Sequence, residues 1–336
     1  IQCYGGGLEI SREQGYKLQE TQAYLSLGKA YRSDNHKEMA IEHYEKGLQI
    51  SREQEYKLQE TQAYLGLGEV YICDDQNRMA IEHYEKGLQI SSEQEYKLQK
   101  TQAYLGLGEA YRFDNQNRMA IQCYEKCLQI SIEQEYKLQK TQAYLWLGEA
   151  YRCDNQNQAA IHHYEESLKI AREQGYKRQE TQAYLGLGEA YRSDNHNQMA
   201  IEYYEKGLQI SSEQGYKLQE TQAYLSLGEA YRSDNHYEKA IEYYQKALEI
   251  PREQRCQMEE TQGLGEVYRS DNQNQTVNKH HGKALEIARE GENKVLGKVA
   301  YLGLEESYKS ENSFQKTAHS WKNLTENTNE EFSNFA

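Results

Sequence analysis

Apolar residues along the chain recur at the three- and four-residue spacing that forms one face of a helix. From about residue 16 to residue 32 this face consists of Ala23, Tyr24, Leu27, Ala30 and Tyr31. A second apolar face follows a short polar turn and runs to about residue 54. Its members are Met39, Ala40, Ile41, Tyr44, Gly47, Leu48 and Ile50. The pattern predicts two amphipathic helices separated by a turn.

This two-helix pattern is repeated with a period of 40 residues. The stretch 20–31 recurs at 60–71, 100–111, 140–151, 180–191 and 220–231, and degraded copies follow at 260–268 and 299–308. A fixed period of this length is typical of a solenoid, in which each repeat packs on its neighbours. We therefore expect an all-α fold: a right-handed α-solenoid, or superhelix, of stacked antiparallel helix pairs.

The repeat boundaries follow from the same period. We expect one solenoid over residues 1–325 that begins with a half repeat at 1–15, and a polar, disordered tail at 326–336. The regular repeats are 16–55, 56–95, 96–135, 136–175, 176–215 and 216–255. A shortened repeat at 256–292 and a degenerate capping repeat at 293–325 complete the stack, since terminal repeats must present a wetter face. The chain starts within a repeat, so we expect it to be part of a longer protein.

Small and polar residues occupy fixed places in each repeat. The turn between the helices contains Asp34 and Asn35, either of which could cap the second helix. Glycine costs about 1 kcal/mol in a helix relative to alanine, so recurrent helical glycines indicate close packing. We expect Gly28 to face Ala40 where the two helices of a repeat cross, and Gly47 to face the next repeat.

These positions resemble the tetratricopeptide repeat. The match rests on Tyr24, Leu27, Gly28, Tyr31, Ala40, Tyr44 and Gly47, which stand at that family's offsets. Arg52 stands where the family usually has a proline. The period of the repeat is also longer than the family's common one of about 34 residues. The long repeats are similar to those of Pins/LGN-type adaptors and of large multi-repeat scaffolds. The resemblance implies protein–protein interaction as the activity.

Charge and composition narrow the range of partners. Lys and Arg number 39 against 53 Asp and Glu, a net charge of −14, which argues against nucleic acid and anionic membranes. No apolar run approaches the roughly 20 residues that span a bilayer. The six cysteines do not recur at one repeat position, so we expect free thiols and a cytoplasmic location.

The sequence contains no pattern typical of a catalytic, nucleotide or metal site. Cys123 and Cys127 lie four apart, but no matching ligands stand beside them, and most histidines fall at turn or outer positions. Solvated side chains explain these residues better than a ligand set does. We therefore expect no enzyme activity, no metal and no cofactor.

The tetratricopeptide resemblance implies a concave groove lined by the first helix of each repeat. Carried onto this chain, it predicts rows of glutamine, leucine, glutamate and arginine. Phe113 and Trp146 interrupt the symmetry and are candidate anchors for a partner's apolar side chains. The predicted partner-binding residues are Gln102, Leu105, Glu109, Arg112, Phe113, Gln142, Leu145, Trp146, Glu149, Arg152, Gln182, Leu185 and Arg192. Alternatively, glutamate and arginine three residues apart neutralise each other and bind nothing.

The function we expect is that of an adaptor or scaffold. It would hold a peptide or helical segment of a partner protein in the groove. Two alternatives remain open. One is a structural array that self-associates through the exposed half repeat around Ile1–Ile10, and the other is a regulatory arm of a larger signalling protein or enzyme.

Overall fold

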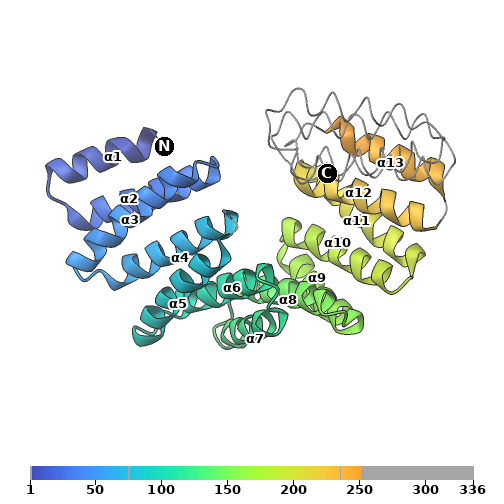
Figure 1. Cartoon of the computed structure of the whole chain (residues 1–336), viewed down its shortest axis with the longest axis horizontal. Coiled ribbons are helices and arrows are strands. Elements are labelled where there is room, and N and C mark those ends of the chain that lie inside the picture. Colours follow the sequence, from blue (N-terminus) through green and yellow to red (C-terminus); the bar gives the residue numbers. More distant parts are fainter. Residues whose placement is uncertain (1, 75, 235, 251–336) are drawn as a thin grey trace, which may run out of the picture. The chain divides into compact units, whose positions relative to one another are not determined.

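The computed structural model describes residues 2–74, 76–234 and 236–250, and in these ranges it contains thirteen helices and no strand. The helices are α1 (Gln2–Glu13), α2 (Lys17–Ser33), α3 (Lys37–Glu53), α4 (Lys57–Cys73), α5 (Asn77–Glu93), α6 (Lys97–Phe113), α7 (Asn117–Glu133), α8 (Lys137–Cys153), α9 (Asn157–Gln174), α10 (Lys177–Ser193), α11 (Asn197–Gln214), α12 (Lys217–Ser233) and α13 (Tyr237–Glu249) (Figure 1). The predicted repeat at 256–292, the capping repeat at 293–325 and the tail at 326–336 lie outside the described residues.

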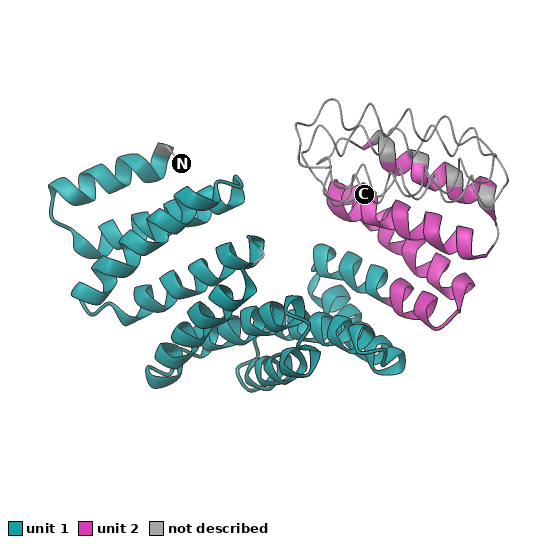
Figure 2. Ribbon diagram, viewed as in Figure 1, with its two compact units in different colours: residues 1–186 teal, residues 187–336 magenta. Residues whose placement is uncertain are grey.

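The chain forms two compact units, residues 1–186 and 187–336, which divide within α10 (Figure 2). We call the even-numbered helices A helices and the odd-numbered ones B helices. In the first unit each A helix packs on the B helix that follows, from α2 on α3 to α8 on α9, and α3, α5 and α7 pack on the next A helix. In the second unit α12 packs between α11 and α13. The predicted all-α solenoid of antiparallel helix pairs is confirmed.

The turns between helices are built by one backbone motif. At the end of α3, Glu55 has a left-handed φ of 57°, and the backbone N–H of Tyr56 donates to the carbonyl of Ser51 at 2.7 Å. At the end of α2, Asn35 has a φ of 59°. These bonds satisfy carbonyls that the last helical turn leaves without partners. The capping prediction is wrong, because His36 occupies the N-cap of α3 without a side-chain hydrogen bond and Asp34 closes α2.

The tyrosine in the middle of each B helix joins neighbouring repeats. The ring of Tyr44 on α3 lies against Gly28 of α2 and Gly66 of α4, where an added methyl group would overlap it. Gly28 therefore faces Tyr44 rather than Ala40, contrary to the prediction. Gly47 also differs from the prediction, because it packs against Tyr24 and Leu25 of its own repeat. Apolar periodicity identifies the buried face of a helix but not which neighbouring helix covers each position.

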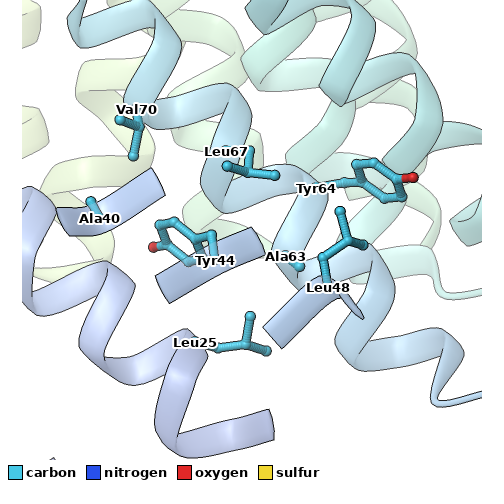
Figure 3. Close-up of a cluster of buried hydrophobic side chains, with 8 residues drawn as sticks. All are labelled: Leu25, Ala40, Tyr44, Leu48, Ala63, Tyr64, Leu67 and Val70. Carbon is cyan, nitrogen blue, oxygen red and sulfur yellow. The ribbon is translucent and has the colours of Figure 1, made fainter. Parts of the chain in front are cut away.

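The core runs between helix pairs. In one cluster, shown in Figure 3, Leu25 of α2 and Tyr44 of α3 lie among side chains of α4 such as Leu67 and Val70. Burying an aliphatic side chain of this size stabilises the fold by about 1.5–3 kcal/mol. Each repeat thus supplies only part of a core, and the next repeat completes it.

Candidate protein-binding surface

The A helices of the first unit form a continuous surface. Helix α2 packs on α4, α4 on α6 and α6 on α8. We define the A-helix surface by side chains on the last two turns of α4, α6 and α8. They are Glu69, Ile72, Glu109, Arg112, Phe113, Trp146, Glu149 and Arg152. Contacts between successive A helices show that these side chains meet: the Arg112 guanidinium on α6 lies 4.0 Å from the Glu149 carboxylate on α8.

The predicted leucine and glutamine rows differ in exposure. Leu145 and Leu185 are 4% and 3% exposed, so we leave them out of the candidate surface, and Leu105 is half-buried. The leucines point toward the B helix of their own repeat. For example, a methyl group added to Gly87 on α5 would lie 3.2 Å from Cδ2 of Leu65 on α4. Among the glutamines, Gln102 is exposed, whereas Gln142 and Gln182 are half-buried.

Glutamates and arginines of the A helices pair with each other. On α8, Arg152 donates from Nη2 to Oε1 of Glu149 at 2.7 Å and from Nε to Oε2 at 3.1 Å. The hydroxyl of Tyr164 donates to the same carboxylate at 2.8 Å. In the second unit, Arg192 donates to Glu189 at 2.9 Å in the same way. This pairing within a helix is the neutralised arrangement considered as an alternative from the sequence.

Burial and charge act in opposite directions on the Glu149 carboxyl. Desolvation, the largest influence, raises its pKa. The hydrogen bond and positive charge of Arg152, the hydrogen bond from Tyr164 and the charge of Arg112 outweigh it and leave the pKa below its usual range. Glu149 is therefore a charged, fully partnered group.

Glu109 differs from Glu149 although the two occupy the same place in adjacent repeats. Within the part of the chain that the structure describes, the half-buried Glu109 side chain has no hydrogen bond and no ion pair. Arg112 on its own helix turns toward Glu149. The preceding repeat carries Ile72 where the others carry arginine. Desolvation raises the pKa of Glu109, the positive charges of Arg112 and Arg32 only partly oppose it, and the negative charge of Glu69 adds to the rise.

The aromatic residues predicted as anchors differ from each other. Phe113 is 46% exposed, whereas Trp146 is half-buried and packs against the cluster that contains Tyr124 and Leu147. The Arg112 guanidinium lies 4.4 Å from the centre of the Phe113 ring and 5.7 Å from that of Trp146. Trp146 is thus less exposed than we expected, because its side chain fills a position that is glycine in neighbouring repeats.

Tyr84 of the B helix α5 lies beneath this surface, at a place that the sequence pattern did not single out. Its ring lies between α4 and α6, since a methyl group on Gly68 would be 2.8 Å from Cζ and one on Gly106 would overlap it. The side chain is 2% exposed, and its hydroxyl has no hydrogen bond among the described residues. The glycines on both sides, which recur in the sequence, were the signal that marks its place.

The arginine that replaces the family's proline has a separate role at the turns between repeats. Arg52 at the end of α3 donates from Nε to Glu60 of α4 at 3.4 Å, and from Nη2 to the hydroxyl of Tyr64. Arg12 and Arg172 make the same contacts at their own turns. These arginines therefore fix the entry of the following A helix and do not belong to the candidate surface.

Some of the described histidines and cysteines are buried and pack in the fold, whereas Cys3, Cys73 and Cys153 are exposed. His83 stacks on Tyr71 with ring centres 5.2 Å apart, and burial lowers the pKa of His83 to about 4. Burial raises the pKa of the Cys127 thiol to about 12 and that of Cys123 to about 11. Such groups stay neutral at physiological pH. Nowhere in the described ranges do three or more histidine, cysteine or acidic residues meet as a metal site would require.

None of the described helices has the length and apolar character needed to cross a bilayer.

Solved structures with the same fold are numerous, although their sequences differ greatly. A signal transduction ATPase with a tetratricopeptide repeat sensor from Pyrococcus horikoshii matches with a TM-score of 0.66 and 17% identity, over 94% of this chain and 50% of that one. Aspartyl phosphate phosphatase F from Bacillus subtilis matches with a TM-score of 0.62 and 14% identity, over 86% and 75%. A Rap protein complexed with competence and sporulation factor matches with a TM-score of 0.57 and 18% identity, over 89% and 98%.

Sequence comparison places the repeats in a family. No curated protein sequence matches the chain. Models of the tetratricopeptide repeat match residues 21–54, 59–133, 140–213 and 197–253, which together exceed half of the chain. These ranges coincide with the described helix pairs from α2 to α13. The chain belongs to the tetratricopeptide repeat family.

Proposed function

We propose that this protein is a non-catalytic scaffold that binds a peptide or helical segment of a partner protein on the A-helix surface. The observation that carries the proposal is the exposed ring of Phe113, which stands beside Arg112 and Trp146 where α6 packs on α8. Aromatic residues and arginine are the side chains most enriched at interaction hot spots. The family's general use in protein interaction supports the same function.

The pairing of charges limits what this surface can bind. Arg152 is engaged by Glu149, and Arg112 lies between two aromatic rings and the same carboxylate. The Arg152 guanidinium is therefore already bonded to a carboxylate, and that of Arg112 is directed toward the same carboxylate at 4.0 Å. The partner's apolar side chains would therefore contact Phe113 and the exposed edge of Trp146, and its polar groups would contact Gln102.

A site-directed crosslinking experiment tests this function. Peptides are first selected from a displayed random dodecapeptide library on the purified protein. The photoreactive residue p-benzoylphenylalanine is then placed at position 113 on α6 or, as a control, at the exposed position 165 on α9. We expect crosslinks to the selected peptides at position 113 only, and weaker binding by Phe113→Ala. Equal crosslinking at both positions, or an unchanged affinity of Phe113→Ala, would contradict the proposal.

One further observation favours self-association as a second function. On α1, Tyr4 and Ile10 are 49% and 61% exposed, whereas the equivalent Tyr44 of α3 is 4% exposed. Helix α2 covers Tyr44 from one side, and no described A helix covers Tyr4 in this way. We expect sedimentation velocity to show an average mass that grows with concentration, and a Tyr4→Ser, Ile10→Ser variant to remain monomeric. A parent protein that stays monomeric throughout would rule this function out.

A further inference from the structure

The pattern of charge pairing on the A-helix surface contains one gap. Arg32 of α2 pairs with Glu69 of α4 in the next repeat, and Arg112 of α6 extends toward Glu149 of α8. An arginine at the position of Ile72 would reach Glu109 by the same step. Isoleucine supplies no charge, so the Glu109 carboxylate has no partner among the described residues.

A second, independent feature lies beside this carboxylate. The ring of Tyr84 lies between Gly68 of α4 and Gly106 of α6. Burial raises the pKa of its hydroxyl, and the negative charges of Glu69 and Glu109 raise it further. Two repeats further along, the equivalent Tyr164 hydroxyl donates to Glu149 of its own repeat, but that of Tyr84 has no hydrogen bond among the described residues. The Tyr84 hydroxyl therefore keeps hydrogen-bonding capacity that a bound group can use. The buried hydroxyls of Tyr124 and Tyr204 likewise have no hydrogen-bond partner among the described residues.

The exposed face of Phe113 completes the arrangement. Glu109 and Phe113 lie four residues apart on α6 and are therefore neighbours on one helical face. The equivalent contact is visible on α8, where the Cys153 thiol donates to Glu149 at 3.8 Å. Carboxylates, a phenol oxygen and an aromatic ring all favour a cation.

The positive charges of Arg112 and Arg32 act on Glu109 and partly lower its pKa, and the Arg112 guanidinium lies 4.4 Å from the centre of the Phe113 ring, but neither arginine forms an ion pair with Glu109. Arg32 is bound to Glu69, Arg112 is directed to Glu149, and Lys29 of α2 is exposed. Glu69 and Glu109 both have raised pKa values, first because of desolvation, and Glu69 adds to the shift of Glu109 by its own charge. A cation bound here would relieve this cost, because an opposite charge favours the ionised carboxylates.

We propose that Glu109, Glu69, the Tyr84 hydroxyl and the Phe113 ring form a site for a lysine or arginine side chain of the partner segment. The site specifies the chemistry of the bound segment: a basic residue next to an apolar one, with the charged group on Glu109 and the apolar side chain beside Ile72 and Phe113. This rests on the proposed function, because the basic residue belongs to the segment bound on the A-helix surface.

The test uses the peptides selected from the random dodecapeptide library on the parent protein. We expect them to be enriched in lysine or arginine next to an apolar residue. Replacing that lysine by norleucine, which keeps the chain length and removes the charge, should weaken binding about tenfold or more. Glu109→Gln and Ile72→Arg should weaken binding of the unmodified lysine peptide by a similar factor. The first removes the negative charge of the site, and the second supplies an arginine that pairs with Glu109 in place of the peptide.

A matched control and a double-mutant cycle make the result specific. Glu165→Gln removes an exposed carboxylate from a B helix and should leave affinity within about twofold. On the Glu109→Gln protein, the norleucine peptide should bind within about twofold of the lysine peptide, because the two changes remove the same interaction. Circular dichroism confirms that each variant is folded, and the isosteric Glu109→Gln stands alone if Ile72→Arg does not fold.

The outcomes separate the two proposals. Peptides that crosslink at position 113 but need no basic residue, or that bind Glu109→Gln as well as the parent, overturn the basic-side-chain site and leave the scaffold function standing. Peptides that do not contact position 113 at all overturn the scaffold function and this site with it.

Discussion

The helix pairs α6–α7 and α8–α9 are adjacent copies of one pattern with different chemistry at matching positions. Glu149 on α8 accepts hydrogen bonds from Arg152 and Tyr164, whereas Glu109 on α6 accepts none among the described residues. Gly106 leaves space for the ring of Tyr84, whereas Trp146 fills the corresponding position. One copy is satisfied internally, and the other keeps an unpaired charge and an exposed aromatic ring.

This difference shows how near-identical repeats acquire distinct roles. The helices and their packing are set by positions that do not vary, such as the buried tyrosine of the B helix. The surface is set by a few substituted positions, and a substitution in one repeat changes the partner available to the next. Ile72 on α4 stands at the position from which Arg32 and Arg112 approach a glutamate of the following repeat, and Glu109 on α6 has no such ion pair.

Copying the tryptophan into the preceding repeat should have the largest effect. In Gly106→Trp, the new side chain would meet the ring of Tyr84, which already occupies the space above Gly106. We expect a loss of about 3 kcal/mol in the free energy of unfolding, at the upper end of overpacking effects. Urea denaturation followed by circular dichroism measures it. A loss below about 1 kcal/mol would mean that the junction adjusts as freely as it does at Trp146.

Replacing each of the two glutamates by glutamine should have different effects on the free energy of unfolding. Glu149→Gln leaves Arg152 without its anionic partner, and we expect a loss of about 2 kcal/mol in unfolding free energy. Glu109→Gln should change it by no more than about 0.5 kcal/mol, since no contact is lost. Urea denaturation of both variants at neutral pH gives the comparison. Equal losses would show that Glu109 has a partner after all.

A change outside the charged surface should affect both pairs equally. Glu95 precedes α6 and Glu135 precedes α8, and both have a left-handed backbone with φ near 55°. Gly175 occupies the same position before α10. Glycine adopts this conformation without strain, so Glu95→Gly and Glu135→Gly should each stabilise the protein by about 0.5–1 kcal/mol. Thermal unfolding measures both, and unequal gains would show that the two turns differ.

The smallest expected effect is that the contributions of Glu109 and Glu149 to stability depend on pH in opposite directions. The pKa of Glu109 is raised in the folded state, so its contribution to stability is present below the unfolded pKa and is lost as pH rises through the folded value. The pKa of Glu149 is lowered, so its contribution is present above the unfolded pKa and is lost as pH falls through the folded value.

Unfolding free energies of the parent and the two glutamine variants measure this dependence. The stability of the parent should fall relative to that of Glu109→Gln as pH rises from about 4.3, the usual glutamate pKa, because the protonated carboxyl resembles the amide and only the ionised carboxylate carries the cost of desolvation. The difference between the parent and Glu149→Gln should shrink as pH falls below the same value. Curves that run in the same direction would contradict the assignment of opposite shifts.

Sequence periodicity predicted the helices and their bounds closely. The apolar face around Tyr24 and Leu27 indicated a helix over about residues 16–32, and α2 spans Lys17–Ser33. The turn was predicted less well, because the backbone of Asn35 adopts a left-handed conformation and its neighbour Asp34 ends α2 instead of capping α3. Local hydrogen bonding decides such details, and a pattern of apolar residues does not contain it.

The candidate surface was predicted only in part. The three-residue spacing of Glu149 and Arg152 indicated their pairing, which the structure contains. Whether Glu109 forms an ion pair depends on the direction of the Arg112 side chain and on the residue that the preceding repeat places beside it. The spacing of residues along one helix does not give these contacts between helices. Trp146 was expected at the surface because the tetratricopeptide resemblance places its position in the groove, yet its half-buried side chain packs against the cluster that contains Tyr124.

The tyrosine that lies between two glycines has a consequence for how such a chain can change in length. Tyr44, Tyr84 and Tyr164 each contact a glycine of their own copy and one of the following copy. Unequal recombination that adds or deletes 40 residues among these copies brings together a tyrosine and glycines that already fit. Copy number can therefore vary without a new interface, whereas an exchange that moves Trp146 next to another tyrosine must be accommodated by repacking.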